Sequence, residues 1–252
     1  MSSSKKKKAP LIKVRGTGLS IHLFRMMGMS LTPEKLVTTL KGIKYEPQKG
    51  KQPPGAGFNK VSLTGKVVKA DFMADFGVPI RIRDPDGSFK SKRYYAVDNG
   101  TLLIKTDRNT VEVRGSEKVA RRVRRVLASA KIAQLETLNL NGGAKKLYDM
   151  AIDVDTVLVS GISKKGNLTQ AEFKGGSLQS EEEVGMYTRR YGGEVTRFRG
   201  TFRYGGISGT ELKTSVNGVN GSVMIWSADD LKPKDVNWIV KLMEDSAPPP
   251  TR

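Results

Sequence analysis

The pattern of apolar and polar positions predicts the same series of elements twice along the chain. Each series runs from a strand into a helix and then through several antiparallel strands to a second helix. In the first series, Thr32 is placed to cap a helix that begins at Pro33 and ends at Gly42. The other elements of this series are predicted as strands at residues 11–24, 61–72, 101–105 and 110–114 and as a helix at 116–130.

Turn sequences mark one hairpin in each series. Asp84-Pro85-Asp86-Gly87 stands between IRIR and SFKSKRYYAV, and Asn217-Gly218 stands between two short strand patterns. The second series is predicted as strands at residues 152–161, 195–204, 212–216 and 221–226 and as helices at 177–191 and 232–244.

Two series of this kind indicate a duplicated unit with a period of roughly 120–130 residues. We therefore expect an α+β fold made of two tandem, pseudo-symmetric units of antiparallel sheet plus helices. The expected division is a disordered basic tail at 1–10, a basic α+β repeat at 11–133, a linker at 134–150, a second α+β repeat at 151–245 and a disordered proline-rich tail at 246–252.

The excess positive charge is confined to the first half of the chain. The whole chain carries 44 Lys+Arg against 25 Asp+Glu, a net charge of +19. Residues 1–133 hold 29 basic and 10 acidic residues, whereas residues 134–252 hold 15 of each. This segregation favours a polyanionic partner, most simply nucleic acid, which the first half would contact. The partner that we expect is double-stranded DNA. Charge that serves only solubility is the alternative.

Composition excludes several classes of site. The chain has no cysteine, and His22 is its single histidine, so thiolate sites, disulfides and histidine-based metal cages are not expected. We expect no cofactor, no metal and no enzymatic activity; a metal-dependent nuclease that uses Asp86 and Glu112 is the alternative. No apolar run approaches the roughly 18–20 residues of a membrane span, and the start lacks a secretory signal. The expected location is therefore intracellular, in the nucleus or cytoplasm.

Basic residues in several segments are candidates for contact with nucleic acid. Those around the first hairpin alternate with tyrosines, which suits neutralisation of phosphates combined with stacking on bases. An exposed hairpin tip without a ligand is the alternative for this group. The predicted nucleic-acid contacts are Lys5, Lys6, Lys7, Lys8, Arg81, Arg83, Lys90, Lys92, Arg93, Lys105, Arg197, Arg199 and Arg203.

Four further arginines belong to the predicted helix at 116–130. Its apolar stripe of Val119, Val123 and Leu127 is expected to pack on a sheet, so the arginines lie on the other faces. They have few acidic partners one turn away, and we expect them to contact a partner protein or outlying phosphates rather than form only a solvated face. They are Arg121, Arg122, Arg124 and Arg125.

The segment LLIKTDRNTVEVRGSEKVARRVRRVL resembles the hallmark of the TATA-binding protein family, a strand, turn, strand and helix. Leu102-Leu103-Ile104 and Gly115 match that hallmark, and Tyr45-Glu46-Pro47 is similar to the family's Tyr-x-Pro. The second half of the chain matches only in its pattern of strand, turn, strand and helix, in the segment LKTSVNGVNGSVMIWSADDLKPKDVNWIVKLM. The likeness is nearer to divergent relatives encoded by large DNA viruses than to a cellular protein.

The resemblance implies two curved sheets that form a saddle on a widened minor groove, with phenylalanines wedged between base steps. The candidate wedges are Phe58, Phe198 and Phe202, and Lys105 stands where the family has a wedge phenylalanine. It also implies a role in transcription initiation, transcription proteins as partners and, for a viral source, a location in a viral factory or virion. The alternative function is a structural nucleic-acid-packaging or virion-associated protein that binds without sequence specificity.

Overall fold

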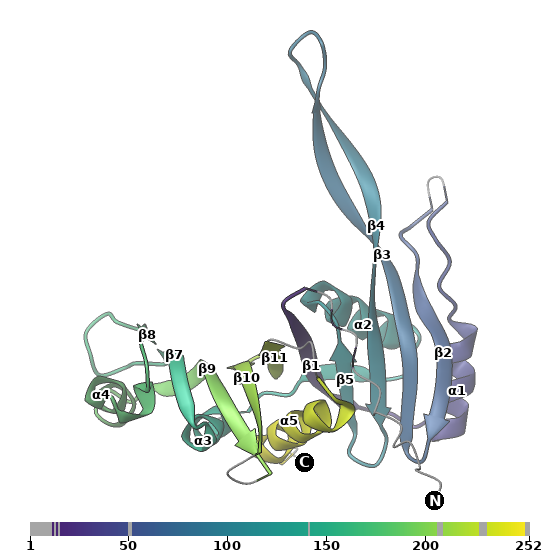
Figure 1. Ribbon diagram of the computed structural model, residues 1–252. Helices are drawn as coiled ribbons and strands as arrows, with labels where there is room; N and C mark the ends of the chain where they lie inside the picture. The colour runs from purple at the N-terminus through teal and green to yellow at the C-terminus, as the bar shows by residue number, and fades with distance from the viewer. Residues whose placement is uncertain are drawn as a thin grey trace, which may run out of the picture. The chain divides into compact units, whose positions relative to one another are not determined.

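The computed structural model describes residues 12, 14, 16–49, 52–140, 142–205, 209–226 and 231–249. Within these residues the chain forms five α-helices and eleven strands (Figure 1), and the strand pairs within each unit are antiparallel. The predicted mixed α+β class is therefore confirmed. The chain divides into two compact units: the N-terminal unit is Ile21–Thr137, and the C-terminal unit is Leu138–Arg252 together with Met1–Ser20.

The N-terminal unit is an antiparallel sheet covered by two helices. Its strands lie in the order β2, β3, β4, β5 and β1, and β6 also pairs with β1. The bounds are β1 Gly18–Met27, α1 Pro33–Gly42, β2 Ala56–Thr64, β3 Val67–Arg83, β4 Phe89–Lys105, β5 Thr110–Arg114, α2 Glu117–Ser129 and β6 Gln134–Thr137.

Both helices of this unit begin close to where the sequence predicts, and each has a capping side chain at its N-terminus. The Thr32 hydroxyl accepts a hydrogen bond from the Lys35 amide at 3.4 Å, with Pro33 in the first helical turn. Ser116 caps α2 in the same way, because its hydroxyl accepts from the Val119 amide at 3.4 Å. The single strand predicted at 61–72 is wrong: the chain reverses at Gly65, whose φ is +57°, and continues as a second strand.

The apolar faces of α1 and α2 cover one face of this sheet. Leu36 and Leu40 of α1 and Val123 and Leu127 of α2 are fully buried. They lie in one cluster with sheet residues that include Phe72. The predicted apolar stripe of α2 thus packs as expected, which leaves its arginines outside the core.

The C-terminal unit has a different strand order. Its elements are α3 Gly143–Met150, β7 Asp153–Ser160, β8 Gln170–Lys174, the 3₁₀ turn η1 Leu178–Ser180, α4 Glu182–Arg189, β9 Glu194–Tyr204, β10 Thr210–Asn217, β11 Ser222–Trp226 and α5 Pro233–Ser246. The sheet runs β11, β10, β9, β7 and β8. In the N-terminal unit β1, the strand before the first helix, pairs with β5, the strand before α2. In the C-terminal unit β7, which precedes α4, pairs with β9, the first strand after that helix.

Several predicted boundaries differ from the observed elements. The strand predicted at 11–24 is β1, Gly18–Met27, and the strand predicted at 101–105 is the end of the longer β4. The predicted linker at 134–150 contains β6 and α3, and the predicted helix at 177–191 is a 3₁₀ turn followed by the shorter α4. Gly192, with φ of +71°, ends that segment before β9. The two units therefore share the predicted order of strand, helix, antiparallel strands and helix, but not the connections between strands.

Candidate nucleic-acid interface

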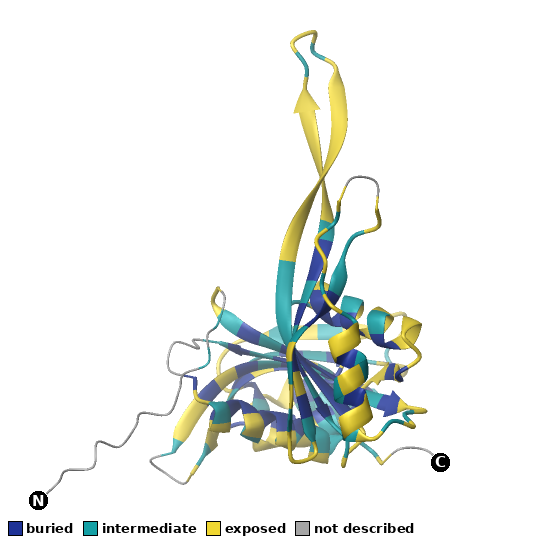
Figure 2. Ribbon diagram, turned by 90° about the vertical axis from the view of Figure 1, so that its right-hand side faces the viewer, coloured by how far each residue is buried: buried dark blue, intermediate teal, exposed yellow. Residues whose placement is uncertain are grey.

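Strands β3 and β4 form a hairpin that extends well beyond the ends of the neighbouring strands β2 and β5. They pair without interruption from Val67 with Lys105 to Arg83 with Phe89. Among the described strands, β2 pairs with β3 only as far as Ala74, and β5 pairs with β4 only as far as Thr101. Beyond Phe76 and its partner Ala96 the hairpin continues as a projecting two-stranded ribbon (Figures 1 and 2). We call residues 77–95 the arm.

The arm is exposed to solvent along its whole length. Every residue in it is exposed except Asp84 and Gly87, which are half-buried in the turn. The predicted turn is confirmed: the Asp84 amide donates to the Ser88 carbonyl at 2.8 Å, and the Gly87 amide donates to the Asp84 carbonyl at 2.9 Å. Hydrogen bonds from Ser88 also hold the pKa of Asp86 below its ordinary value. An ordered turn thus closes a ribbon that has no core of its own.

The pairing register divides the basic residues of the arm between two faces. Directly paired residues of an antiparallel ribbon share a face, and successive residues alternate between faces. One face, the arginine face, carries Arg81, Arg83, Phe89, Arg93 and Tyr95. The Arg93 side chain lies across Gly77 on this face, since its Cδ is 2.9 Å from the place where a Cβ at Gly77 would stand. None of the three arginines has a carboxylate within ion-pair distance in the described part of the chain.

The opposite face, the lysine face, is apolar along β3. It carries Val78, Ile80, Ile82, Lys90, Lys92 and Tyr94. Lys90 pairs with Asp84 at 2.6 Å, and Lys92 lies 5.3 Å from the centre of the Tyr94 ring. Both lysines therefore have partners within the arm, and the cations without partners are on the arginine face.

Asp75 fixes the base of the arm to the loop before β2. Its carboxylate is 5% exposed and accepts hydrogen bonds from the Tyr45 hydroxyl at 2.7 Å, the Gln48 amide at 2.8 Å and the Gly55 amide at 3.0 Å. Burial opposes ionisation of Asp75, but these donors hold its pKa below the ordinary value. The same contact raises the pKa of Tyr45 to about 12. Asp75 is therefore a charged anchor rather than a titrating site near neutral pH.

Asp98 fixes the other strand of the hairpin to α2. It accepts hydrogen bonds from the Ser116 hydroxyl at 2.9 Å and the Asn99 amide at 2.9 Å, and Lys118 lies 3.3 Å away. The Lys118 ammonium also lies 5.0 Å from the centre of the Phe76 ring. Both strands are thus held where the arm leaves the sheet.

We expect Asp75→Asn to lower the free energy of unfolding by about 2 kcal/mol at neutral pH, because an amide replaces a buried carboxylate with three donors. The pKa of Asp75 is lower in the folded than in the unfolded chain, so its contribution is present above the unfolded value of about 3.9 and is lost as pH falls through the folded value. Urea unfolding across this pH range measures both effects. Asp71→Asn is the control, because Asp71 is a half-exposed residue of β3 that pairs with Lys60 at 3.8 Å. Equal losses in the two variants would contradict the anchoring role.

The arginines of α2 have separate roles. The Arg122 Nη2 donates to the Pro54 carbonyl at 2.7 Å, so this side chain holds the loop before β2. Arg121 lies 3.6 Å from Glu117, one turn earlier. Arg124 and Arg125 are exposed and have no acidic partner in the described part of the chain. The prediction that arginines of α2 contact a partner protein or outlying phosphates therefore applies best to Arg124 and Arg125.

Lys105 is held within the fold. Its side chain is 17% exposed and lies 3.3 Å from Glu112, which is 1% exposed and also accepts a hydrogen bond from Arg114 at 2.5 Å. The expectation that Lys105 contacts nucleic acid is corrected, because its side chain is mostly covered and its ammonium lies against a buried carboxylate. The arrangement also gives no support to the nuclease alternative: Asp86 lies in the turn of the β3–β4 hairpin, whereas Glu112 lies on β5 opposite Leu103, near the other end of β4.

Strand β9 carries a second set of predicted contacts. As the alternation predicts, Arg197, Arg199 and Arg203 are exposed, and Phe198 and Phe202 on the other face are buried. Arg199 pairs with Asp155 at 2.5 Å, and Arg203 pairs with Glu211. Burial opposes ionisation of Asp155, yet Arg199, Thr156 and Lys213 hold its pKa below the ordinary value.

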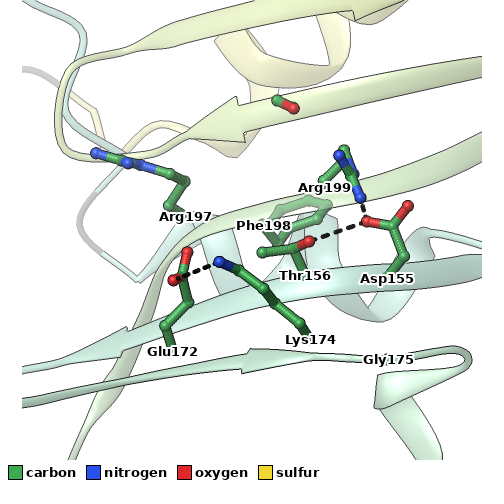
Figure 3. Close-up of a pocket in the computed structure, with 9 residues that line it drawn as sticks. Asp155, Thr156, Glu172, Lys174, Gly175, Arg197, Phe198 and Arg199 are labelled. Atoms are coloured by element: carbon green, nitrogen blue, oxygen red, sulfur yellow. Dashed lines mark hydrogen bonds and ion pairs between the residues drawn. The ribbon is translucent and has the colours of Figure 1, made fainter.

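A shallow pocket of about 610 Å³ lies on this face of the C-terminal unit (Figure 3). Arg197 and Arg199 line it together with Glu172 and Lys174, which pair with each other at 3.1 Å. Of the three predicted arginines, two already have carboxylate partners. The local charge is therefore largely balanced, unlike that of the arginine face of the arm.

The three candidate wedge phenylalanines are core residues. Each is 1% exposed. The Phe58 ring lies 5.2 Å from that of Phe72, and the Phe198 ring lies 5.9 Å from that of Tyr148 and 6.1 Å from that of Phe202. The wedge assignment is corrected because rings packed on both sides cannot enter a base step without leaving the core.

The predicted contacts at Lys5, Lys6, Lys7 and Lys8 lie outside the described residues. No described helix is long and apolar enough to cross a membrane, and no three acidic or histidine residues among those described gather as a metal site would require.

Comparison with known proteins identifies no family for the chain. No family model and no curated protein matches it.

Proposed function

We propose that this protein is a non-enzymatic nucleic-acid-binding protein whose principal contact is the arginine face of the arm. The observation that carries the proposal is the placement of Arg81, Arg83 and Arg93 on one exposed face of a projecting ribbon, without carboxylate partners among the described residues. Guanidinium groups bind phosphate oxygens with two parallel hydrogen bonds, and their charge is not lost at any physiological pH.

The dimensions of the arm suit a polynucleotide. Its seven paired positions span about 20 Å at the rise of an antiparallel strand, a length along which one nucleic-acid strand presents several phosphates at about 3.4 Å per charge. The arm carries five basic and two acidic residues. Phosphate contacts of this kind give affinity that falls steeply with salt and depends little on sequence.

The proposal favours binding without sequence specificity over a TATA-type minor-groove mechanism. The TATA-type mechanism inserts apolar wedges between base steps, and the three phenylalanines assigned to that role are buried. A packaging or virion-associated role needs only phosphate contacts and is supported by the charge of the first half of the chain. A role in transcription initiation would then depend on partner proteins, for which Arg124 and Arg125 offer an exposed basic surface.

A pair of double variants with equal loss of charge tests the proposal. Arg81→Gln with Arg93→Gln removes two cations from the arginine face, and Lys90→Gln with Lys92→Gln removes two from the lysine face. We expect the arginine double variant to bind a labelled oligonucleotide at least tenfold more weakly at low salt. The slope of log K against log salt should become shallower by about 1.5, since each lost contact contributes about 0.7–0.9.

Fluorescence anisotropy over a salt series measures both quantities. The lysine double variant should change affinity by less than threefold, because its cations already have partners in the arm. Equal losses in the two variants would show that only total charge matters, and no loss in either would show that the arm is not the contact.

A further inference from the structure

We infer that the arginine face takes single-stranded nucleic acid, with unpaired bases stacked on Tyr95 and Phe89. This inference rests on the proposed function and specifies its ligand. Both rings belong to β4 and share a face with the three arginines. Tyr95 is 39% exposed and Phe89 is 67% exposed, which leaves ring surface open to a ligand.

The local backbone leaves room for a cation beside the Tyr95 ring. The cross-strand partner of Tyr95 is Gly77, which has no side chain, and the Arg93 side chain occupies that space. Glycine within a strand is typical of a place where another group approaches the backbone closely. The Arg93 side chain, which lies across Gly77, places a cation on the same face as the ring. A base and the phosphate next to it could therefore be bound at one position.

The position of Tyr95 argues against a duplex ligand. In a duplex the faces of the bases are covered by their neighbours, and a side chain reaches them only by unstacking a base step at a cost of a few kcal/mol. Tyr95 and Phe89 lie about 20 Å apart at the rise of a strand, so a duplex would have to open two separate base steps to stack on both rings. The bases of a single strand need no such opening, because their faces are already free.

The alternation of rings and cations also matches single-strand recognition. Proteins that bind single strands without sequence preference combine a basic track for the backbone with aromatic rings for successive bases. Here Arg93 and Tyr95 lie at one end of the arginine face, and Arg83 and Phe89 are direct partners at the other. A strand that runs along the ribbon would meet both pairs.

The test compares ring removal on the two faces of the arm. Tyr95→Leu and Phe89→Leu keep an apolar side chain but remove the aromatic ring, and neither changes the charge. Tyr94→Leu is the matched control: Tyr94 is the neighbouring residue, is 43% exposed and lies on the lysine face. Fluorescence anisotropy is measured with a labelled single strand of about 16 nucleotides and with a labelled duplex of the same length, both at the same salt concentration.

We expect the unaltered protein to bind the single strand at least tenfold more tightly than the duplex. Tyr95→Leu and Phe89→Leu should each weaken single-strand binding about tenfold, within the range for loss of one stacked base. Their salt slopes and duplex affinities should change little, and Tyr94→Leu should bind as the unaltered protein does.

The outcomes separate this inference from the function on which it rests. If the duplex binds as tightly as the single strand, or if Tyr95→Leu matches Tyr94→Leu, the inference is overturned while the arginine contacts stand. If neither nucleic acid binds at low salt, the proposed function itself fails. Circular dichroism of each variant confirms that these exposed substitutions leave the fold intact.

Discussion

Replacing residues 77–95 by an Asn-Gly turn is expected to weaken nucleic-acid binding at least 100-fold and to leave both units folded. The replacement joins Phe76 to its partner Ala96, a geometry that a two-residue turn closes. It removes both faces of the arm and three net positive charges. The buried apolar residues of β3 end at Ala74, so no core contact is lost. Anisotropy titration and urea unfolding measure the two expectations.

The lysine tail provides the comparison for this experiment. Replacing Lys5, Lys6, Lys7 and Lys8 by glutamine removes four charges, one more than removal of the arm. Since phosphate contacts by a short run of lysines contribute charge without stacking, we expect a loss of about tenfold or less. A larger loss from the tail variant than from removal of the arm would make the tail the principal contact and would contradict the proposed function.

Features that depend on neighbouring residues were predictable from the sequence. The helix caps at Thr32 and Ser116 and the turn at Asp84–Gly87 are set by side chains within three or four positions of the backbone groups they satisfy. The turn at Gly65 was missed, because the apolar alternation continues across it from β2 into β3. Periodicity alone cannot show where an alternating pattern is folded back on itself.

Strand order was not predictable because it depends on contacts between distant residues. The two halves carry the same order of elements, yet β1 pairs with β5 and β7 pairs with β9. The choice is made by which apolar surfaces meet, such as Tyr148 of α3 against Phe198 of β9. The sequence pattern shows each apolar surface, but it does not show which other surface packs against it.

The sequence located the candidate site but did not show how its basic residues divide between the two faces of the arm. The basic cluster between Arg81 and Arg93 is visible in the chain, whereas its division into an arginine face and a lysine face follows from the β3–β4 register. The apolar alternation of β3 continues unchanged from Phe72 to Ile82, although the described core covers only its first part. Sequence therefore could not show that the core ends near Ala74 and that an exposed arm begins. That boundary is the feature that makes the arm a binding element.

Substitution of Phe198 decides between the core role and the wedge role of the phenylalanines. We expect Phe198→Ala to lower the free energy of unfolding by about 3–5 kcal/mol, because it opens a cavity beneath Tyr148 and Phe202. Phe198→Leu retains most of the volume and should cost about 1 kcal/mol. Urea unfolding provides these values, and anisotropy on folded Phe198→Leu should give unchanged affinity for nucleic acid.

The exposed Phe89 is the matched control for that experiment, and the two rings are expected to give opposite results. Phe89→Ala should change the free energy of unfolding by less than about 0.5 kcal/mol, as surface substitutions do, while it weakens binding. A wedge at Phe198 would reverse this outcome: Phe198→Leu would lose affinity, and the stability of Phe198→Ala would be close to that of the unaltered protein. The first pattern follows from a ring that is 1% exposed between two aromatic neighbours and another that is 67% exposed on the arm. Since burial and ligand contact exclude each other for a ring in one conformation, the pair of substitutions separates stability from binding.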